Sequence, residues 1–227
     1  IVTDGNSIKP FETAQDHKRV NEGDKGENTG GMGAYSPSRL INKNFEEKII
    51  EKIINPTLDG LKDMGIQYKG FLYAGLMIKN NEPYLIEYNV RMGDPECQTI
   101  LPKLKTDLFE VLLSCCDNKL KDLEILWDKK KSLSIVLCSK GYPGNYKKNL
   151  VINNIKKIQT DKNNLFFHAG TILKDNKIFT VGGRVLNFVS IANSFKEARQ
   201  NIFKNINILK WNDGFFRKDI GYKVIDE

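Results

Sequence analysis

Long apolar segments are missing from this chain of 227 residues. No run of eighteen consecutive apolar residues occurs, so we predict no membrane-spanning helix and no membrane partner. A basic leader followed by a short apolar segment is also missing, so no signal peptide is predicted. The sequence opens with Ile1 instead of Met, and residues 1–5 resemble a strand that enters a turn. We therefore expect the chain to begin inside a domain, as part of a longer protein.

Cysteine and histidine are too few and too scattered to form a recognisable metal site. The four Cys residues include no CxxC pair, and there are only two His residues. This pattern predicts neither a zinc site nor a disulfide framework. Reduced thiols are the rule in the cytoplasm, and we expect a cytoplasmic protein.

Arginine is scarce as well, because only six of the 35 basic residues are Arg, although the formal net charge is +7. The Lys residues are dispersed, and the densest run is Lys129-Lys130-Lys131. The chain has no basic stripe interleaved with aromatic residues, as a nucleic-acid-binding surface would have. We therefore predict no nucleic-acid partner. The hydrophobic content of 40% and the charged content of 28% are ordinary for a globular protein of one or two domains.

The most informative segment is 84–98, where an apolar run is followed by three polar residues at a spacing of two. Glu87, Asn89 and Arg91 would point to one face of a strand, because successive side chains alternate. A carboxylate and an amide oxygen suit a hard cation such as Mg²⁺, and a guanidinium suits a phosphate or a carboxylate. The pattern indicates nucleotide-phosphate chemistry, followed by a sharp turn at Gly93-Asp94-Pro95.

An ordinary solvated strand face is the alternative interpretation of the same three residues. Apolar segments lie on both sides of them, at 72–78 and 100–104. We therefore predict that this strand does not form the edge of its sheet. An acid and an Arg inside a sheet would need partners.

A polar, glycine-rich segment at 11–40 shows no apolar periodicity and is predicted to be a long loop, functional or disordered. In Asp16-His17-Lys18-Arg19, the two cations suit a phosphate or an acidic substrate, and Asp16 would hold an amine or orient a base. A charged loop is the alternative. Gly30-Gly31-Met32-Gly33 would expose backbone N–H groups to an anion or would be a flexible connector. It matches neither the Walker A nor the dinucleotide-binding spacing.

The first half of the chain predicts two helices and a hairpin. A cap at Asn44 starts a helix that runs to about Gly65, with a kink or break at Pro56. Strands at 70–78 and 84–89 are joined by a hairpin turn. Asp107 caps a second helix, which runs to about Asn118.

A polar stretch at 117–131 separates the halves, and we place a domain boundary there. Strands are predicted beyond it at 132–139, 165–169, 177–182 and 184–191, with a turn at 141–144. Ser194 and Glu197 form a capping box for a helix to about Asn207. The fold class is therefore α+β, with mostly antiparallel sheets.

Three motifs of the second half permit two interpretations. His168 to Thr171 and Gly182 to Leu186 each combine a polar side chain with glycine, and Arg217 to Gly221 is similar. They would either approach the site of the first half or form hairpin turns with an Arg at a strand end.

Eight segments, taken in order, resemble the glycinamide ribonucleotide synthetase family, and the resemblance extends over essentially the whole chain. The segments are 15–19, 28–37, 70–77, 86–98, 141–144, 167–171, 182–186 and 217–221. The resemblance implies an ATP-grasp ligase of de novo purine synthesis. Such an enzyme joins glycine to 5-phosphoribosylamine through glycyl phosphate and converts ATP to ADP and phosphate.

The resemblance also implies a role for each candidate residue. Glu87 and Asn89 would bind Mg²⁺ or Mn²⁺, and Arg91 and Asp16 would be catalytic, with Arg91 stabilising the transferring phosphoryl group. The remaining residues would bind substrate and phosphate groups: His17, Lys18, Arg19, Asn28, Thr29, Gly30, Gly31, Met32, Gly33 and Asp94. One departure from the family pattern is that Tyr73 to Met77, on the neighbouring strand, offers no acid as a second metal ligand. A metal would then depend on Glu87, Asn89, phosphates and water.

The resemblance assigns residues 1–120 to the C-terminal portion of an ATP-grasp domain and residues 128–227 to a small α+β C-terminal domain. The N-terminal domain of the family and the lobe that clamps adenine would lie outside this chain. We therefore expect this segment alone to be inactive. Another ATP-grasp carboxylate–amine ligase, a biotin-independent carboxylase of purine synthesis and a non-catalytic scaffold fragment are the alternatives.

Overall fold

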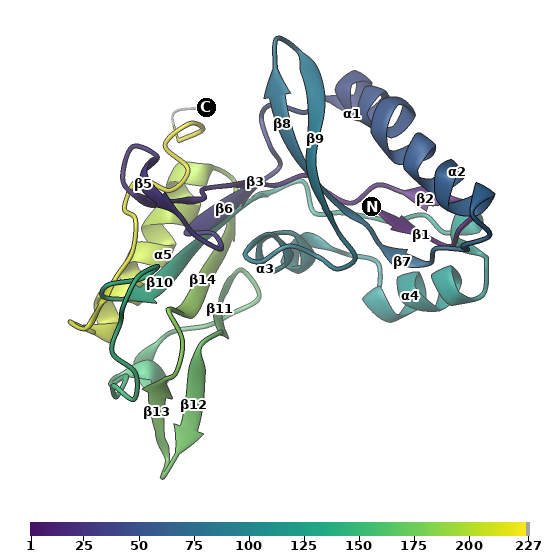
Figure 1. The fold of residues 1–227 in the computed structure, drawn as a ribbon. Coiled ribbons are helices and arrows are strands. Elements are labelled where there is room, and N and C mark those ends of the chain that lie inside the picture. The colour runs from purple at the N-terminus through teal and green to yellow at the C-terminus, as the bar shows by residue number, and fades with distance from the viewer. Residues whose placement is uncertain (226–227) are drawn as a thin grey trace. The chain divides into compact units, whose positions relative to one another are not determined.

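The computed structural model describes residues 1–225, and their contacts divide the chain into two units, which are described separately (Figure 1). The first unit comprises residues 1–13, 38–93 and 104–128, and the second comprises residues 14–37, 94–103 and those from 129 onward. None of the helices within residues 1–225 has both the length and the apolar character needed to cross a bilayer. Units defined by contacts need not coincide with domains, so the division into 1–120 and 128–227 stays a prediction.

The helical segment of the first unit begins at Asn42, whose side chain accepts a hydrogen bond from the N–H of Phe45 at 2.9 Å. Helix α1 (Lys43–Ile49) follows, which corrects the predicted cap at Asn44. Asn42 and Asn44 are both capping residue types, and the structure places the cap two residues earlier than predicted, with Phe45 buried. A π-helical turn, η1 (Ile50–Ile54), precedes α2 (Asn55–Asp63). Pro56 at the start of α2 lacks an N–H, which explains why the predicted interruption occurs there.

Strands β8 (Tyr73–Lys79) and β9 (Glu82–Asn89) form the predicted antiparallel hairpin. Its turn residues Asn80 and Asn81 both have positive φ, a conformation that asparagine tolerates. The hairpin packs on the α1–η1 segment through a cluster of buried and half-buried residues, namely Phe45, Ile49, Ile54, Ala74, Leu76, Ile78 and Tyr88.

Two smaller features complete the first unit. Gly70–Phe71 forms a separate strand, β7, in a three-stranded antiparallel sheet with β1 (Val2–Thr3) and β2 (Ile8–Lys9), in the order β2-β1-β7. Helix α4 (Leu108–Cys116) begins at the predicted cap, where Asp107 accepts the N–H of Phe109 at 2.8 Å. A 3-10 turn, η3 (Leu120–Asp122), follows it.

The second unit is built on an antiparallel sheet in the order β11-β14-β10-β6-β3 (Figure 1). Its strands are β11 (Asn164–His168), β14 (Arg184–Ala192), β10 (Lys131–Ser139), β6 (Gly33–Ser36) and β3 (Gln15–Asp16), with β15 (Gly214–Phe215) paired to β10. The predicted strands at 132–139, 165–169 and 184–191 are confirmed within one residue. Strand β12 (Thr171–Lys174), which the sequence did not predict, pairs with β13 (Lys177–Thr180), and η4 (Ile155–Lys157) is a 3-10 turn.

Two helices cover opposite faces of this sheet. Tyr35 packs edge-on against Phe195 at the start of α5 (Phe195–Leu209), and its register partner Leu133 shares that face. Ser134 is next in the strand and therefore points to the other face, where it accepts a hydrogen bond from Thr99 of α3 (Glu96–Ile100) at 2.8 Å. The turn η2 (Leu101–Lys103) continues α3. As predicted, Ser194 caps α5 by accepting the N–H of Glu197.

The predicted long loop at 11–40 is wrong, because this segment contains four short strands. Strands β3 and β6 join the main sheet, and β4 (Arg19–Asn21) pairs with β5 (Lys25–Asn28) in a hairpin. Strands of two to four residues are too short to show an apolar period. Gly33 lies against β10, where a Cβ atom would come within 2.5 Å of the Ser134 carbonyl oxygen. This glycine therefore permits the close approach of two strands.

Candidate functional site

Glu87 and Asn89 lie on the same face of β9, as predicted. The Asn89 amide nitrogen donates to a Glu87 carboxylate oxygen at 3.3 Å. Gly75, the register partner of Glu87 on β8, leaves room for this side chain, since a Cβ there would lie 3.1 Å from Glu87 Cγ. Glu87 is exposed. The pair therefore offers an accessible carboxylate beside an amide.

Two predictions for this strand are wrong. Arg91 lies beyond the end of β9 at Asn89, and its guanidinium donates to the neighbouring Met92 carbonyl at 2.9 Å. The alternating pattern continues in the sequence although the chain has already left the strand. Within residues 1–225, β9 pairs only with β8, so it is an edge strand in this structure.

The donor atoms at this face fit a hard divalent cation. A carboxylate and an amide supply oxygen ligands, and the pair is held by one long hydrogen bond only. No cluster of three or more His, Cys, Asp or Glu side chains placed to hold a metal occurs in residues 1–225. A cation bound here would therefore need further oxygen ligands besides those of Glu87 and Asn89.

Asp16 is a buried acid of the second unit, and its pKa is raised. Its side chain is 8% exposed and forms an ion pair with Lys18 at 2.7 Å. Gly31 lies against it, because a Cβ on Gly31 would come within 3.0 Å of an Asp16 carboxylate oxygen. Burial and, after it, the negative charge of buried Glu96 raise the pKa of Asp16 to about 6, against the opposing effect of Lys18. Such a carboxyl group changes its protonation state close to neutral pH, which suits proton transfer.

His17 has the opposite environment and is 2% exposed. Its ring lies between those of Tyr35 and Tyr222, with centroid distances of 5.8 and 6.1 Å. Burial lowers the pKa of His17 to about 4, and the nearby Arg217 cation lowers it as well. The imidazole is therefore neutral at pH 7 and packs inside the unit. Its predicted contact with a substrate stays a prediction.

The remaining residues of the first motif fix the β4–β5 hairpin. Arg19 donates to the Gly26 carbonyl at 2.8 Å, and both the N–H and the hydroxyl of Thr29 bond to the Lys18 carbonyl at 2.8 Å. Lys18 and Arg19 are exposed. Asn28 is also exposed and is the register partner of Arg19. An anion from solvent could therefore reach both cations, in competition with the Lys18–Asp16 pair and the Arg19–Gly26 bond.

The glycine-rich segment is divided between the surface and the interior. Gly30 is exposed and Gly31 is buried, and the Gly31 N–H donates to the Thr29 hydroxyl at 3.0 Å. Met32 is fully buried, with its sulfur 3.8 Å from that of Cys138, so its side chain belongs to the core. The Met32 N–H and carbonyl bond to His17 and Val136. Contact of Met32 and Gly33 with a substrate stays a prediction.

Arg184, which was not among the predicted site residues, binds two of them. Its guanidinium donates to the Gly30 carbonyl at 2.9 Å, to the Asp94 carbonyl at 2.8 Å and to the Asp94 carboxylate at 3.0 Å. Tyr142 accepts the Gly30 N–H at 3.0 Å. Arg184 belongs to a motif that the sequence left ambiguous and Tyr142 to a predicted turn, and no local pattern connects residues that are 90 or more positions apart. Both interpretations of Gly182 to Leu186 find support, because Arg184 contacts two predicted site residues and is also the first residue of β14.

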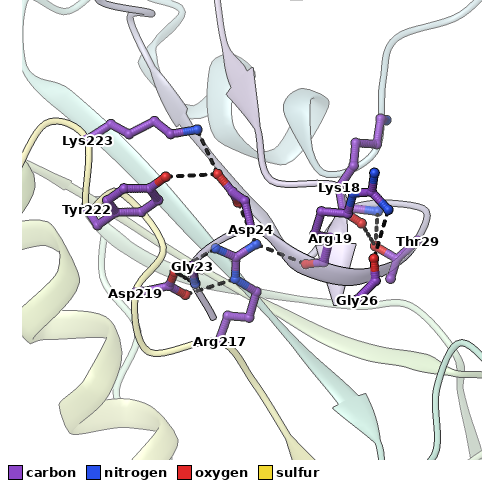
Figure 2. Close-up of polar contacts among 11 residues, drawn as sticks. Lys18, Arg19, Gly23, Asp24, Gly26, Thr29, Arg217, Asp219, Tyr222 and Lys223 are labelled. Atoms are coloured by element: carbon purple, nitrogen blue, oxygen red, sulfur yellow. Dashed lines mark hydrogen bonds and ion pairs between the residues drawn. The ribbon is translucent and has the colours of Figure 1, made fainter. Parts of the chain in front are cut away.

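Arg217 forms a second anchor on the same segment (Figure 2). It is 1% exposed and donates twice to Asp219, once to Asp24 and once to the Arg19 carbonyl, at 2.7 to 2.9 Å. Asp24 also accepts from Tyr222 and Lys223. Burial opposes ionisation of Asp24, but the bonds from Lys223, Arg217 and Tyr222 hold its pKa well below the usual range. The β4–β5 hairpin is thus tied to the C-terminal segment.

Comparisons with known proteins agree with these motifs. The family model described as phosphoribosylglycinamide synthetase, ATP-grasp (A) domain, matches residues 1–97, and the C domain model of the same synthetase matches residues 132–223. A phosphoribosylamine–glycine ligase of Haemophilus influenzae is 44% identical over 100% of this chain and 53% of its own length. A trifunctional purine biosynthetic protein of Gallus gallus is 46% identical over 98% of this chain and 22% of its own length.

A solved structure supports the fold. The crystal structure of phosphoribosylamine–glycine ligase from Thermotoga maritima has a TM-score of 0.80 and 32% identity, covering 92% of this chain and 51% of its own. The chain thus spans about half the length of the single-function relatives that it matches. Two domain models of one synthetase match in order along most of the sequence, and the chain belongs to the phosphoribosylglycinamide synthetase family.

Proposed function

We propose that the full-length protein containing this chain is an ATP-dependent ligase that joins glycine to 5-phosphoribosylamine. The products are glycinamide ribonucleotide, ADP and phosphate, in de novo purine synthesis, and we expect the reaction to occur in the cytoplasm. The observation that carries the proposal is the alignment of nearly the whole chain with relatives named phosphoribosylamine–glycine ligase, at about 40% identity. We also propose that residues 1–120 and 128–227 correspond to the ATP-grasp portion and the C-terminal domain.

In the proposed reaction, a glycine carboxylate oxygen attacks the γ-phosphorus of ATP, and ADP leaves. The amine of 5-phosphoribosylamine then attacks the acyl carbon of glycyl phosphate, phosphate leaves and the nitrogen loses a proton. Each step moves negative charge onto phosphate oxygens, so positioned cations supply most of the catalysis.

The residues of the first unit fit the phosphate part of this chemistry. Glu87 and Asn89 would hold Mg²⁺ or Mn²⁺ through one carboxylate and one amide oxygen. A bound divalent cation would neutralise charge on the phosphates of ATP. Arg91 is exposed and bonded only to a neighbouring carbonyl among the contacts described, so its guanidinium can turn to the transferring phosphoryl group.

The residues of the second unit fit the substrate part. Lys18 and Arg19 present cationic groups at the surface, and the exposed Gly30 follows them in the sequence. Asp16, with a pKa of about 6, would hold the substrate amine or accept its proton. His17, Asn28, Thr29, Met32, Gly33 and Asp94 complete the proposed substrate and phosphate group.

The test is ADP release by the full-length protein with ATP and Mg²⁺, measured with glycine and phosphoribosylamine together, with each alone, and with bicarbonate. The proposal requires turnover only when both substrates are present. Turnover with bicarbonate instead would favour a carboxylase, and no turnover by folded protein would favour a scaffold role. The 227-residue segment is tested beside it, and we expect no turnover from the segment.

A further inference from the structure

We propose that Arg184 is a positioning residue, which holds Gly30 and Asp94 in the arrangement that the ligase reaction needs. The inference rests on the proposed function, because Gly30 and Asp94 are proposed to bind substrate and phosphate groups. Arg184 itself is not proposed to touch a substrate. All residues in the inference belong to the second unit.

The contacts of Arg184 converge on two segments that are far apart in the sequence. One guanidinium nitrogen donates to the carbonyls of both Gly30 and Asp94, at 2.9 and 2.8 Å, and the other donates to the Asp94 carboxylate at 3.0 Å. The same carboxylate accepts from Gln98 at 3.2 Å through its second oxygen. The guanidinium therefore joins the glycine-rich segment to the turn that begins α3.

The geometry requires a planar guanidinium beside a glycine. A Cβ atom on Gly30 would lie 3.0 to 3.2 Å from three guanidinium atoms, so any larger residue there would crowd the guanidinium. A Lys ammonium is a point donor and cannot bond three acceptors in this fork geometry. Tyr142 holds the opposite end of the same residue by accepting the Gly30 N–H at 3.0 Å. Gly30 is thus fixed at both its N–H and its carbonyl.

The backbone around Arg184 is packed in a way that fixes its direction. The Gly170 N–H donates to the Arg184 carbonyl at 2.8 Å, and a Cβ on Gly170 would lie 2.5 Å from that oxygen. A Cβ on Gly183 would lie 2.2 Å from the Tyr142 ring. Gly170 and Gly183 therefore allow the 168–171 turn and the Tyr142 ring to pack against the start of β14. They give Arg184 a rigid base, as positioning of another residue requires.

The experiment compares Arg184→Gln, Arg184→Lys and Arg199→Gln in the full-length protein. Arg199 lies on α5 and takes no part in the Arg184 contacts, so its variant is the control for loss of one Arg. We measure kcat and KM for glycine and phosphoribosylamine, the thermal midpoint, and amide hydrogen exchange of the peptide that contains residues 28–33. We expect Arg184→Gln to lower kcat/KM by about 10- to 100-fold, because small misplacements of binding groups carry costs of this size.

The exchange measurement separates the two proposals. Faster exchange in residues 28–33, with the α5 peptides unchanged, is expected for both Arg184 variants and not for Arg199→Gln. If the exchange result holds and the wild-type protein has no ligase activity, the proposed function fails and the anchoring stands. If Arg184→Gln leaves exchange and kcat/KM at wild-type values, the positioning role is wrong. The positioning role would also be wrong if Arg184→Lys kept the wild-type kcat/KM, or if the fall in kcat/KM only accompanied a lower thermal midpoint.

Discussion

The two groups of candidate residues differ in how they are held. On β9, Glu87 and Asn89 are joined by a single hydrogen bond of 3.3 Å, and Glu87 is exposed. The candidate residues of the segment 14–37 are held by two arginines: Arg184 bonds the Gly30 carbonyl, and Arg217 bonds the Arg19 carbonyl. The first group is therefore free to bind ligands at little cost to folding. In the second group, a substitution that removes a contact of a candidate residue should also lower the stability of its unit.

The largest expected effect is on stability, from loss of the Arg217 anchor. Arg217→Met would leave Asp24 and Asp219 without their buried partner, and we expect the full-length protein to lose about 3–5 kcal/mol of unfolding free energy. Urea unfolding followed by far-UV circular dichroism measures the loss. Arg199→Met is the control and should change stability little. A loss below about 1 kcal/mol would show that the network is not a structural anchor.

The second prediction concerns the exposed group. Glu87→Gln keeps the shape of the side chain and removes its charge, so we expect kcat to fall at least about 100-fold, which corresponds to about 2.7 kcal/mol. The unfolding free energy should stay within about 0.5 kcal/mol of wild type. Glu82→Gln on the same strand is the matched control, because Glu82 pairs only with Lys48 and Lys52 and should be dispensable for turnover. Equal turnover by both variants would remove Glu87 from the site.

The third prediction uses the pKa of Asp16, which is about 6 in the folded protein and close to 4 in an unfolded chain. The folded state therefore binds this proton more tightly, and ionisation of Asp16 costs stability as the pH rises from 4 through 6. Asp16→Asn should be more stable than wild type by on the order of 2 kcal/mol at pH 8 and about equal to it at pH 4.

The measurement is urea unfolding at several pH values, with Asp213→Asn, an exposed acid of the same unit, as the control. His17 contributes in the opposite sense, since its pKa of about 4 makes the folded state lose stability as the pH falls from 6.5. This contribution is common to wild type and Asp16→Asn and cancels in their difference. If the difference in unfolding free energy between Asp16→Asn and wild type is the same at pH 4 and pH 8, burial does not raise the pKa of Asp16.

The sequence predicted those elements whose signals are local. Strand β10 and the capping of α5 at Ser194 follow from an apolar run and a capping box. The strands in 14–37 were missed because each is short and is held by its neighbours in the sheet. Their residues Gly33 and Ala34 are buried by the approach of β10, and no periodicity reveals this.

The candidate site divides in the same way. The spacing of Glu87 and Asn89 correctly predicted a shared face, because alternation along a strand is a property of neighbouring residues. Arg184 and Gly30 are 154 positions apart, and their contact depends on the order of strands in the sheet. A single sequence carries no direct signal for such a pair. The ambiguous glycine and arginine motifs contain Arg184 and Arg217, but the sequence did not give the contact partners of either.

The smallest expected effect concerns the turn that fixes the register of the β8–β9 hairpin. Asn81 has φ +59°, which glycine adopts without strain, so Asn81→Gly should stabilise the protein by about 0.5 kcal/mol. Its carbonyl, which accepts from Lys48 at 2.9 Å, is retained. Asn176→Gly in the β12–β13 hairpin, at φ +56°, is the matched change in the second unit and should give a similar gain. Neither should alter turnover, because both registers are kept.

Asn81→Pro provides the contrast, because proline cannot adopt a positive φ. It should disrupt the pairing that places Glu87 opposite Gly75, and turnover should fall while the second unit keeps its hydrogen-exchange protection. Full activity in Asn81→Pro would mean that the hairpin register does not position the metal ligands. Loss of protection in both units would mean that stability is shared between them, and the contrast between an independent exposed group and an anchored buried group would no longer hold.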